Sequence, residues 1–466
     1  MTHTVLDPPE DPATRLRLPR TGLLPTRRAD APAPWAPLTR LLARPAVAVG
    51  LAVLGTLMLA LIGVASPNDH TLEVRLPLSL LPTLPGAAST YITIGAIALQ
   101  LVGLLGMLAA NAAGWRPDPR RLLLVGAVAV AVFACVSPIG SADTASYAAY
   151  GRIAALGGDP YTTGPDWLGG AYEHLVSSSW LTTPSVYGPI ATWLQQCAAF
   201  VGGSRPWLTI WLLMLANGAV YVAVGWVLIR TAADKTRAAL LWAANPLLIG
   251  LLVGGGHLDT YIAALAVVAV LFARRGRYVR DDLLAGVFVG LACGVKVSAA
   301  LVGVGLVLPL LRQGATARAL RISASAGVTL LLLYGAYGLH MLAPLSTASG
   351  LVSVPSAWQL LRWLGGMTIG PVATADVISA AWPVLLLLIA YLLFRRIGRT
   401  APAVVALPFA LVFAWILVAP WCMPWYAAVV WPLVALLPRS ASARWLAVVT
   451  AGLALVHNTG GHGWVW

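Results

Sequence analysis

The stretch PAVAVGLAVLGTLMLALIGVA, residues 45–65, decides the fold class of this chain. It contains no charged residue, and about 20 apolar residues in a helix are enough to cross the hydrocarbon core of a bilayer. The stretch begins too far from Met1 to be a secretory signal peptide. We therefore expect a first membrane-spanning helix here.

The composition of the whole chain agrees with this interpretation. Of its 466 residues, 59% are hydrophobic and 10% are charged, whereas soluble domains have roughly 25% charged residues. The chain also has 19 Trp, a residue that gathers at membrane interfaces. The composition excludes a soluble globular protein and a disordered chain. The four cysteines are far apart, which gives no sign of a disulfide framework.

Further apolar runs of helical length follow along the rest of the chain. They lie near residues 91–111, 122–138, 207–229, 238–253, 258–273, 283–295, 297–311, 322–340, 376–394, 402–419, 424–437 and 445–457. Together with residues 45–65 they predict an all-α, polytopic integral membrane protein with about thirteen transmembrane helices.

The basic residues orient these predicted spans. The net charge is +14, but it is spread over short clusters between the apolar runs, which argues against nucleic-acid binding. All clusters fall on the side of the N-terminal segment, and the positive-inside rule makes that side of the plasma membrane cytoplasmic. The clusters are Arg116/Arg120/Arg121, Arg230/Lys235/Arg237, Arg274/Arg275/Arg277/Arg280, Arg312/Arg318/Arg321, Arg395/Arg396/Arg399 and Arg439/Arg444.

The chain divides into a tail and one membrane domain. Residues 1–45 are rich in Pro and Arg without an apolar period, so we expect a disordered basic cytoplasmic tail. Residues 46–466 form the predicted transmembrane domain, and its large extracytoplasmic loop, 139–187, is expected to carry the active site. Residues 189–202 are apolar but short. If they spanned, the later basic clusters would lie outside, so we expect an interfacial or half-inserted helix.

The stretch 283–311 must cross the membrane twice between two basic loops. Each crossing then has about 14 residues and rises about 20 Å, against about 30 Å of hydrocarbon. The turn at Lys296 should therefore lie below the outer surface. Backbone turns at that depth need surrounding protein or a water-filled cavity, so we expect this turn and 254–257 to line a recessed extracytoplasmic cavity.

The loop sequence SADTASYAAYGRIAALGGDPYTTGP, residues 141–165, contains the first candidate site residues. Ser141 predicts the N-cap of a helix that ends before Gly157, and on it Asp143, Tyr147 and Tyr150 share one face. A carboxylate beside aromatic rings suits a sugar, because it can accept a hydroxyl proton. Alternatively, Asp143 stabilises the helix N-terminus and the tyrosines anchor an interfacial helix.

Charges inside the apolar runs give the other candidates. His257 and Asp259 in GGGHLD (254–259) are functional candidates by default, although Asp259 can equally stabilise a helix N-terminus. Two such residues are few for a metal site. Lys296 is the only charge between positions 282 and 312, and it either binds a phosphate or snorkels to the surface. Trp425 and Tyr426 line the same side or form an interfacial belt.

The sequence lacks the common nucleotide-binding motifs and the HExxH motif of zinc proteases. There is no Walker-type GxxxxGK[ST], no GxGxxG after a strand and no HExxH. A membrane enzyme with an outer cavity and no nucleotide site would suit a lipid-borne substrate that enters from the bilayer.

Several motifs carry a family resemblance. SxDxxSYAxxGR followed by GxDPYxxGP (141–165), VYGP (186–189), Asn245-Pro246 through GGHLD (255–259) and PWY (424–426) resemble the actinobacterial polyprenol-phosphate-mannose-dependent alpha-1,6-mannosyltransferases, which are C-type glycosyltransferases. The resemblance implies a multi-span fold, an extracytoplasmic site, a mannosyl-phospho-polyprenol donor, inversion, and an acidic base in the large outer loop. That base falls on Asp143.

From the residues and the resemblance together we expect a mannosyltransferase that uses a polyprenyl-phosphate-linked donor and a glycan or glycolipid acceptor. Asp143 is the expected base, and Lys296 with His257 is expected to stabilise the leaving phosphate. No cofactor or metal site is predicted, and dependence on a divalent metal is left open. The other expected substrate-binding residues are Tyr147, Tyr150, Asp159, Tyr161, Asp259, Trp425 and Tyr426.

Two alternatives to the predicted mannosyltransferase function stay open. A lipid or sugar transporter or flippase would also place polar groups at membrane depth. A transferase that uses another polyprenyl-phosphate sugar, such as arabinofuranose, would have a similar site.

Overall fold

The computed structural model describes residues 40–353, 356–397 and 400–457. Most of the predicted tail, 1–45, and the expected extracytoplasmic C-terminal segment after residue 457 therefore lie outside the described residues. Within the described ranges the protein is built of helices and loops, and the β-structure there is a single bridge between Thr71 and Ile139. The all-α prediction is confirmed.

The long and medium apolar helices follow the predicted runs. They are α2 (Pro45–Val64), α3 (Gly86–Ala112), α4 (Pro119–Phe133), α8 (Pro206–Thr231), α9 (Lys235–Leu241), α10 (Pro246–Leu248) with the π-helical segment Ile249–Gly254, α11 (Asp259–Arg275), α12 (Val279–Val295), α13 (Ala300–Arg312), α14 (Thr316–Gly335), α17 (Pro371–Ile397), α18 (Ala403–Val418), the 3-10 turn Pro424–Val429 with α19 (Val430–Leu436), and α20 (Ser442–His457).

Six helical segments of the described chain are long and apolar enough to cross a membrane by length and composition. They are Pro45–Val64, Gly86–Ala112, Pro206–Thr231, Lys235–Gly254, Thr316–Gly335 and Pro371–Ile397. Each of the other predicted spans overlaps a shorter helix. A polytopic membrane protein is therefore supported, and the count of about thirteen crossings stays a prediction.

Several of the basic loops that the sequence predicts to share one side contact one another. The Arg439 guanidinium donates to Asn111 Oδ1 at 2.9 Å and to Asp234 Oδ2 at 2.8 Å, which joins the loops after α3, α8 and α19. Asp282, buried at the start of α12, is bound by Arg318 and Arg321 of α14, each at 2.9 Å. These contacts hold the basic loops together in two groups.

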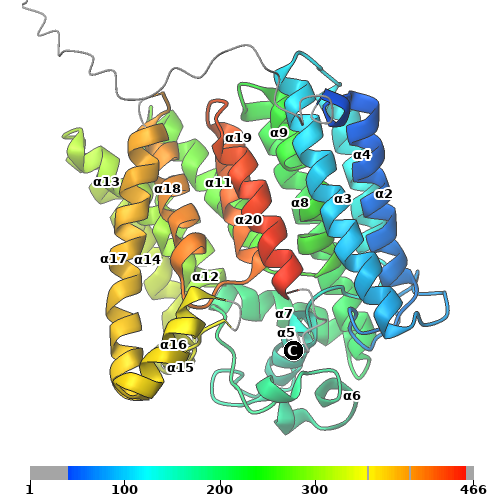
Figure 1. The fold of residues 1–466 in the computed structure, drawn as a ribbon. Coiled ribbons are helices and arrows are strands. Elements are labelled where there is room, and N and C mark those ends of the chain that lie inside the picture. The colour runs from blue at the N-terminus through cyan, green and yellow to red at the C-terminus, as the bar shows by residue number, and fades with distance from the viewer. Residues whose placement is uncertain (1–39, 354–355, 398–399, 458–466) are drawn as a thin grey trace, which may run out of the picture. The chain divides into compact units, whose positions relative to one another are not determined.

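The elements of the outer loop gather at the opposite end. They are α5 (Asp143–Ala155), α6 (Gly170–Glu173) and α7 (Pro189–Gly202), and Figure 1 draws them below the long helices, at the same end as α15 (Ala343–Ser349) and α16 (Ala357–Thr368). Helix α7 packs against α5, α8, α12 and α14. Its 14 residues rise only about 21 Å, so an interfacial position for 189–202 stays our prediction.

Candidate active site

Helix α5 positions the first candidate carboxylate. The helix begins at Asp143, with Ala142 in the N-cap position, so the predicted N-cap at Ser141 is wrong by one residue. The Ser141 hydroxyl still accepts a hydrogen bond from the Asp143 backbone N–H at 3.1 Å, because it lies two residues before it. The helix ends at Ala155, and Gly157 follows with φ of 84°, as the sequence predicted.

Asp143 lies at the open side of a cluster of polar and aromatic side chains. The Tyr147 hydroxyl, one helical turn away, donates to Asp143 Oδ2 at 3.2 Å, and His257 Nδ1 lies 3.5 Å from the same oxygen. The Asp143 side chain is 30% exposed, whereas that of His257 is 1% exposed. The carboxylate is therefore the member of this group that a substrate can reach.

His257 is held between Asp143 and a tryptophan. Its ring stacks on Trp425 with 3.8 Å between ring centroids and 10° between planes. The residue before it, Gly256, has φ of 68°, a conformation that favours glycine. The chain thus turns sharply after the π-helical segment and directs the imidazole toward Asp143.

Lys296 is enclosed by an acid and an aromatic ring. Its Nζ lies 3.5 Å from Asp259 Oδ1 and 3.4 Å above the ring centroid of Tyr426. The side chains of Lys296 and Asp259 are 16% and 5% exposed. Because the ammonium is paired inside the cluster, the structure disfavours the alternative that Lys296 snorkels to the surface.

Tyr187 belongs to the same cluster, although the sequence analysis quoted it only within the VYGP motif (186–189) and did not select it as a site residue. Its ring meets Tyr147 edge-on, with 5.0 Å between centroids. Directly after it, the Gly188 N–H donates to the carbonyl of Val295 at 3.0 Å, beside the Lys296 turn. The signal that could have found it is a tyrosine just before the Gly-Pro that opens α7.

We predict that Gly188→Ala loosens this contact. A Cβ at Gly188 would lie 2.3 Å from the Gly294 carbonyl oxygen, so the two backbones would have to separate. The expected loss in the free energy of unfolding is about 1–3 kcal/mol, with reduced activity because the Tyr187 loop moves. Thermal unfolding of the purified protein measures this loss. Gly327→Ala is the control, since nothing lies within 4 Å of its Cβ; equal effects would contradict the prediction.

Three of the predicted site residues do not join the Asp143 cluster. Tyr150 is buried, and its hydroxyl donates to the Thr183 carbonyl at 2.8 Å. Asp159 Oδ2 lies 2.7 Å from His340 Nε2. The Tyr161 hydroxyl is hydrogen-bonded to Thr192 at 2.7 Å, and its ring contacts Tyr337. The structure does bring together Asp143, Tyr147, His257, Asp259, Lys296, Trp425 and Tyr426.

Three ionisable side chains of the Asp143 cluster, Asp143, Tyr147 and Tyr187, have pKa values shifted from their ordinary values. Burial alone raises the pKa of Asp143, but neighbouring His257 and Lys296 outweigh it, and the pKa falls below the ordinary value. Burial, together with the Asp143 charge, raises the pKa values of Tyr147 and Tyr187 well above the usual tyrosine range. At neutral pH the carboxylate is therefore ionised and both phenols are neutral. Within the described ranges, no three His, Cys, Asp or Glu side chains gather as a metal site would need.

The helices and the site define a class of protein. This is a multi-span membrane protein with an ionised carboxylate, an enclosed ammonium and stacked aromatic rings gathered in one cluster, and its family shows that it is a membrane glycosyltransferase. The chain belongs to the MptA_B family, whose model, described as alpha-(1->6)-mannopyranosyltransferase, N-terminal domain, matches residues 47–312. Asp143, His257, Asp259 and Lys296 lie inside this match. The family resemblance that the motifs carry is confirmed.

Curated relatives carry names that agree with the family. The chain is 26% identical over 349 residues to alpha-(1->6)-mannopyranosyltransferase A of Mycobacterium tuberculosis, which covers 68% of this chain and 64% of that protein. It is 30% identical over 232 residues to a probable alpha-(1->6)-mannopyranosyltransferase of Mycolicibacterium smegmatis. This match covers 47% of the chain and 40% of that protein. The alpha-(1->6)-mannopyranosyltransferase A of Corynebacterium glutamicum is 30% identical over 159 residues. This match covers 33% of the chain and 32% of that protein. The matches thus span less than two thirds of these relatives. No solved structure matches the chain.

Proposed function

We propose that this protein transfers a mannosyl unit from mannosyl-phospho-polyprenol to a hydroxyl of a glycan or glycolipid on the extracytoplasmic side, with inversion and an alpha-1,6 linkage. The relatives named as alpha-(1->6)-mannopyranosyltransferases support the sugar and the linkage. One observation carries the chemistry: the partly exposed Asp143 carboxylate lies in the same enclosed cluster as the Lys296 ammonium.

Asp143 is the proposed base. As the acceptor oxygen attacks the anomeric carbon, its proton passes to Asp143, and the bond from that carbon to the phosphate oxygen breaks with its electron pair on the phosphate. Attack from the face opposite the phosphate inverts the configuration. The Tyr147 hydroxyl and His257 hold the carboxylate in place from two sides, so that its open edge faces the substrate.

Lys296 and His257 are proposed to act on the leaving phosphate. Negative charge on the phosphate grows as the bond to the sugar breaks, and donors already in place stabilise it best. Asp259 orients the ammonium at 3.5 Å, and an ammonium has three N–H donors, so the phosphate can share it with Asp259. Trp425 and Tyr426 are proposed to shape the site by holding its polar groups in place, since the Trp425 ring stacks on His257 and the Tyr426 ring lies under Lys296.

The remaining predicted residues take more distant roles in this proposal. Asp159 and Tyr161, with the exposed Trp193, lie together near Tyr337 and would contact a distal part of the acceptor. Tyr150 supports the loop through its bond to Thr183.

The proposed reaction is tested with the full chain in lipid nanodiscs. We expect a mannosyl-phospho-polyprenol donor and a soluble alpha-mannoside acceptor to yield free polyprenyl phosphate and a disaccharide whose linkage NMR identifies. A transporter or flippase would release no polyprenyl phosphate. Faster transfer from an arabinofuranosyl donor, or a different linkage, would overturn the sugar or the linkage assignment.

The proposed orientation gives a separate prediction. Leu339, 77% exposed after α14, should lie outside, and Tyr278, 57% exposed before α12, should lie in the cytoplasm. In a background without the exposed Cys197, a membrane-impermeant thiol reagent added to intact cells should label Leu339→Cys and not Tyr278→Cys. Permeabilised cells are the control, in which both should react. The reverse pattern would contradict the orientation.

A further inference from the structure

Helix α16 leaves a large apolar surface exposed. Four of its side chains, spaced at i, i+3, i+4 and i+7, are 45–63% exposed: Leu360, Trp363, Leu364 and Met367. This spacing places all four on one face of the helix. Large exposed apolar patches mark contacts with a membrane or with another protein, so this face needs a partner.

The rest of the α16 surface divides into two further faces. Trp358 and Gly365 lie on the face that packs against α17, where a Cβ at Gly365 would lie 2.6 Å from Thr374 Oγ1. Gln359 and Arg362 lie on a third face, and the Arg362 side chain is exposed. Helix α16 therefore has a packed face, an exposed apolar face and a polar face.

A membrane surface fits these three faces. A helix that lies in the plane of the interface directs apolar side chains toward the acyl chains and polar side chains toward water. Tryptophan is typical of this depth, and an arginine beside it can reach headgroup phosphates. Helix α17, which follows directly, is a candidate membrane span and exposes apolar side chains of its own, such as Val372 and Leu387. Figure 1 draws α16 at the lower end of α17, the same end as α5 and α7.

Three hydrogen bonds connect α16, and the serine before it, to the chain after α18. The indole N–H of Trp358 donates to the last carbonyl of α18 at 2.7 Å. The Ser353 N–H donates to the Pro420 carbonyl at 2.9 Å, and the Ser353 hydroxyl accepts from the Cys422 N–H at 3.1 Å. These bonds hold the first part of residues 419–426, which we call the aromatic turn.

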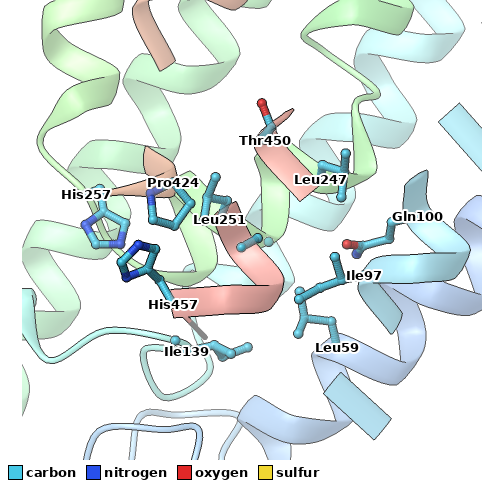
Figure 2. Close-up of a pocket in the computed structure, with 13 residues that line it drawn as sticks. Leu59, Ile97, Gln100, Ile139, Leu247, Leu251, His257, Pro424, Thr450 and His457 are labelled. Carbon is cyan, nitrogen blue, oxygen red and sulfur yellow. The ribbon is translucent and has the colours of Figure 1, made fainter. Parts of the chain in front are cut away.

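The aromatic turn continues into the candidate active site. Its Trp425 ring stacks on His257 with 3.8 Å between centroids, and Figure 2 shows Pro424 of the turn next to His257. The centroid of its Tyr426 ring lies 3.4 Å from Lys296 Nζ. A displacement of α16 would therefore move the two rings that hold the imidazole and the ammonium.

We infer that α16 docks on the outer-leaflet surface of the membrane and, anchored there, sets the position of the aromatic turn. The inference uses the proposed orientation and does not depend on which sugar or donor the protein takes. The partner is the lipid surface itself, with acyl chains beneath the apolar face and headgroup phosphates beside Arg362. The bilayer then helps to hold the active site in its working geometry.

Fluorescence quenching on the full chain in lipid nanodiscs tests the contact with lipid. In a background without Cys135 and Cys197, a fluorophore is attached to Trp363→Cys or to Arg362→Cys. Lipids with a nitroxide near the top of the acyl chain should quench the label at position 363 about twofold more strongly than the label at 362, and aqueous iodide should give the opposite order. Equal iodide quenching at both positions would overturn the inference. So would a label at 363 that neither agent reaches, because another protein chain would then cover it.

Trp363→Glu tests the connection to the aromatic turn. The added carboxylate should lift α16 from the membrane, so buried Cys422 should react with a small thiol reagent roughly fivefold faster or more. Mass spectrometry of the peptides measures this rate, and Cys293, buried in α12, should keep its own. Gln359→Glu is the matched control, because it adds the same charge on the polar face, and it should change neither rate. An unchanged Cys422 rate in a folded Trp363→Glu would overturn the inference.

Turnover gives a third measurement. The kcat of Trp363→Glu should fall roughly tenfold at an unchanged melting temperature, because the site loses its geometry while the fold persists. Gln359→Glu should keep the wild-type kcat, and a wild-type kcat in Trp363→Glu would also contradict the inference. If the wild type transfers no mannose, the proposed function fails, whereas the quenching and thiol measurements still decide the position of α16.

Discussion

Asp143→Asn should leave the protein folded and able to bind donor, yet reduce turnover by roughly 10²-fold or more. Asparagine keeps the shape of the side chain, and its carbonyl oxygen can still accept the hydrogen bond from Tyr147 that is 3.2 Å long in the native protein. It cannot take a proton from the acceptor hydroxyl. We expect kcat to fall while donor affinity, measured by calorimetry, changes little.

The control for this variant lies in the same loop. Asp166→Asn makes the same substitution at an exposed carboxylate and should transfer at the wild-type rate. Equal melting temperatures for the two variants would separate loss of the base from loss of structure. If Asp143→Asn transferred mannose at near wild-type rate, the base would have to be another group, and Asp259, the other carboxylate of the cluster, would be the next candidate.

Lys296→Ala should lower kcat and kcat/KM together by one to three orders of magnitude, or about 1.5–4 kcal/mol of transition-state stabilisation. The physical reason is that phosphate charge grows along the reaction, so the ammonium is worth most in the transition state. Lys296→Arg should restore only part of the rate, because the planar guanidinium fits a different geometry. Steady-state kinetics with the polyprenyl-phosphate donor measures both variants.

The ion pair between Lys296 and Asp259 allows a control that separates loss of stability from loss of catalysis. Lys296→Ala leaves Asp259, only 5% exposed, without its cation, and the melting temperature should fall. The double variant Lys296→Ala with Asp259→Asn removes both charges, so it should recover the melting temperature and not the turnover. Lys235→Ala, at the only other lysine of the chain, should have the wild-type rate. Normal donor affinity and turnover in Lys296→Ala would show that this ammonium does not act on the phosphate.

Contacts within one element were accessible from the sequence. The i, i+4 spacing of Asp143 and Tyr147 places their side chains together in any helix, and the structure has them hydrogen-bonded. The same helical spacing placed Tyr150 on the face of Asp143 and Tyr147 and predicted that it joins them. Its hydroxyl instead donates a hydrogen bond to the Thr183 carbonyl. Helical periodicity sets the direction of a side chain, whereas its partner depends on which loop folds over that face.

The sequence by itself determined the membrane class, the helices and the charged candidates. Burying an ion in hydrocarbon is so costly that His257, Asp259 and Lys296 stand out against apolar runs without any structure. Local composition also placed helix ends near Asp143 and Gly157.

Only the tertiary structure decided which candidates meet. Asp143, His257 and Lys296 lie on or beside α5, α11 and α12, and their contacts depend on how these helices pack, which no local pattern encodes. Packing paired Lys296 with Asp259, brought in Tyr187, and directed Asp159 to His340, because side chains far apart in sequence meet only where whole helices find complementary neighbours.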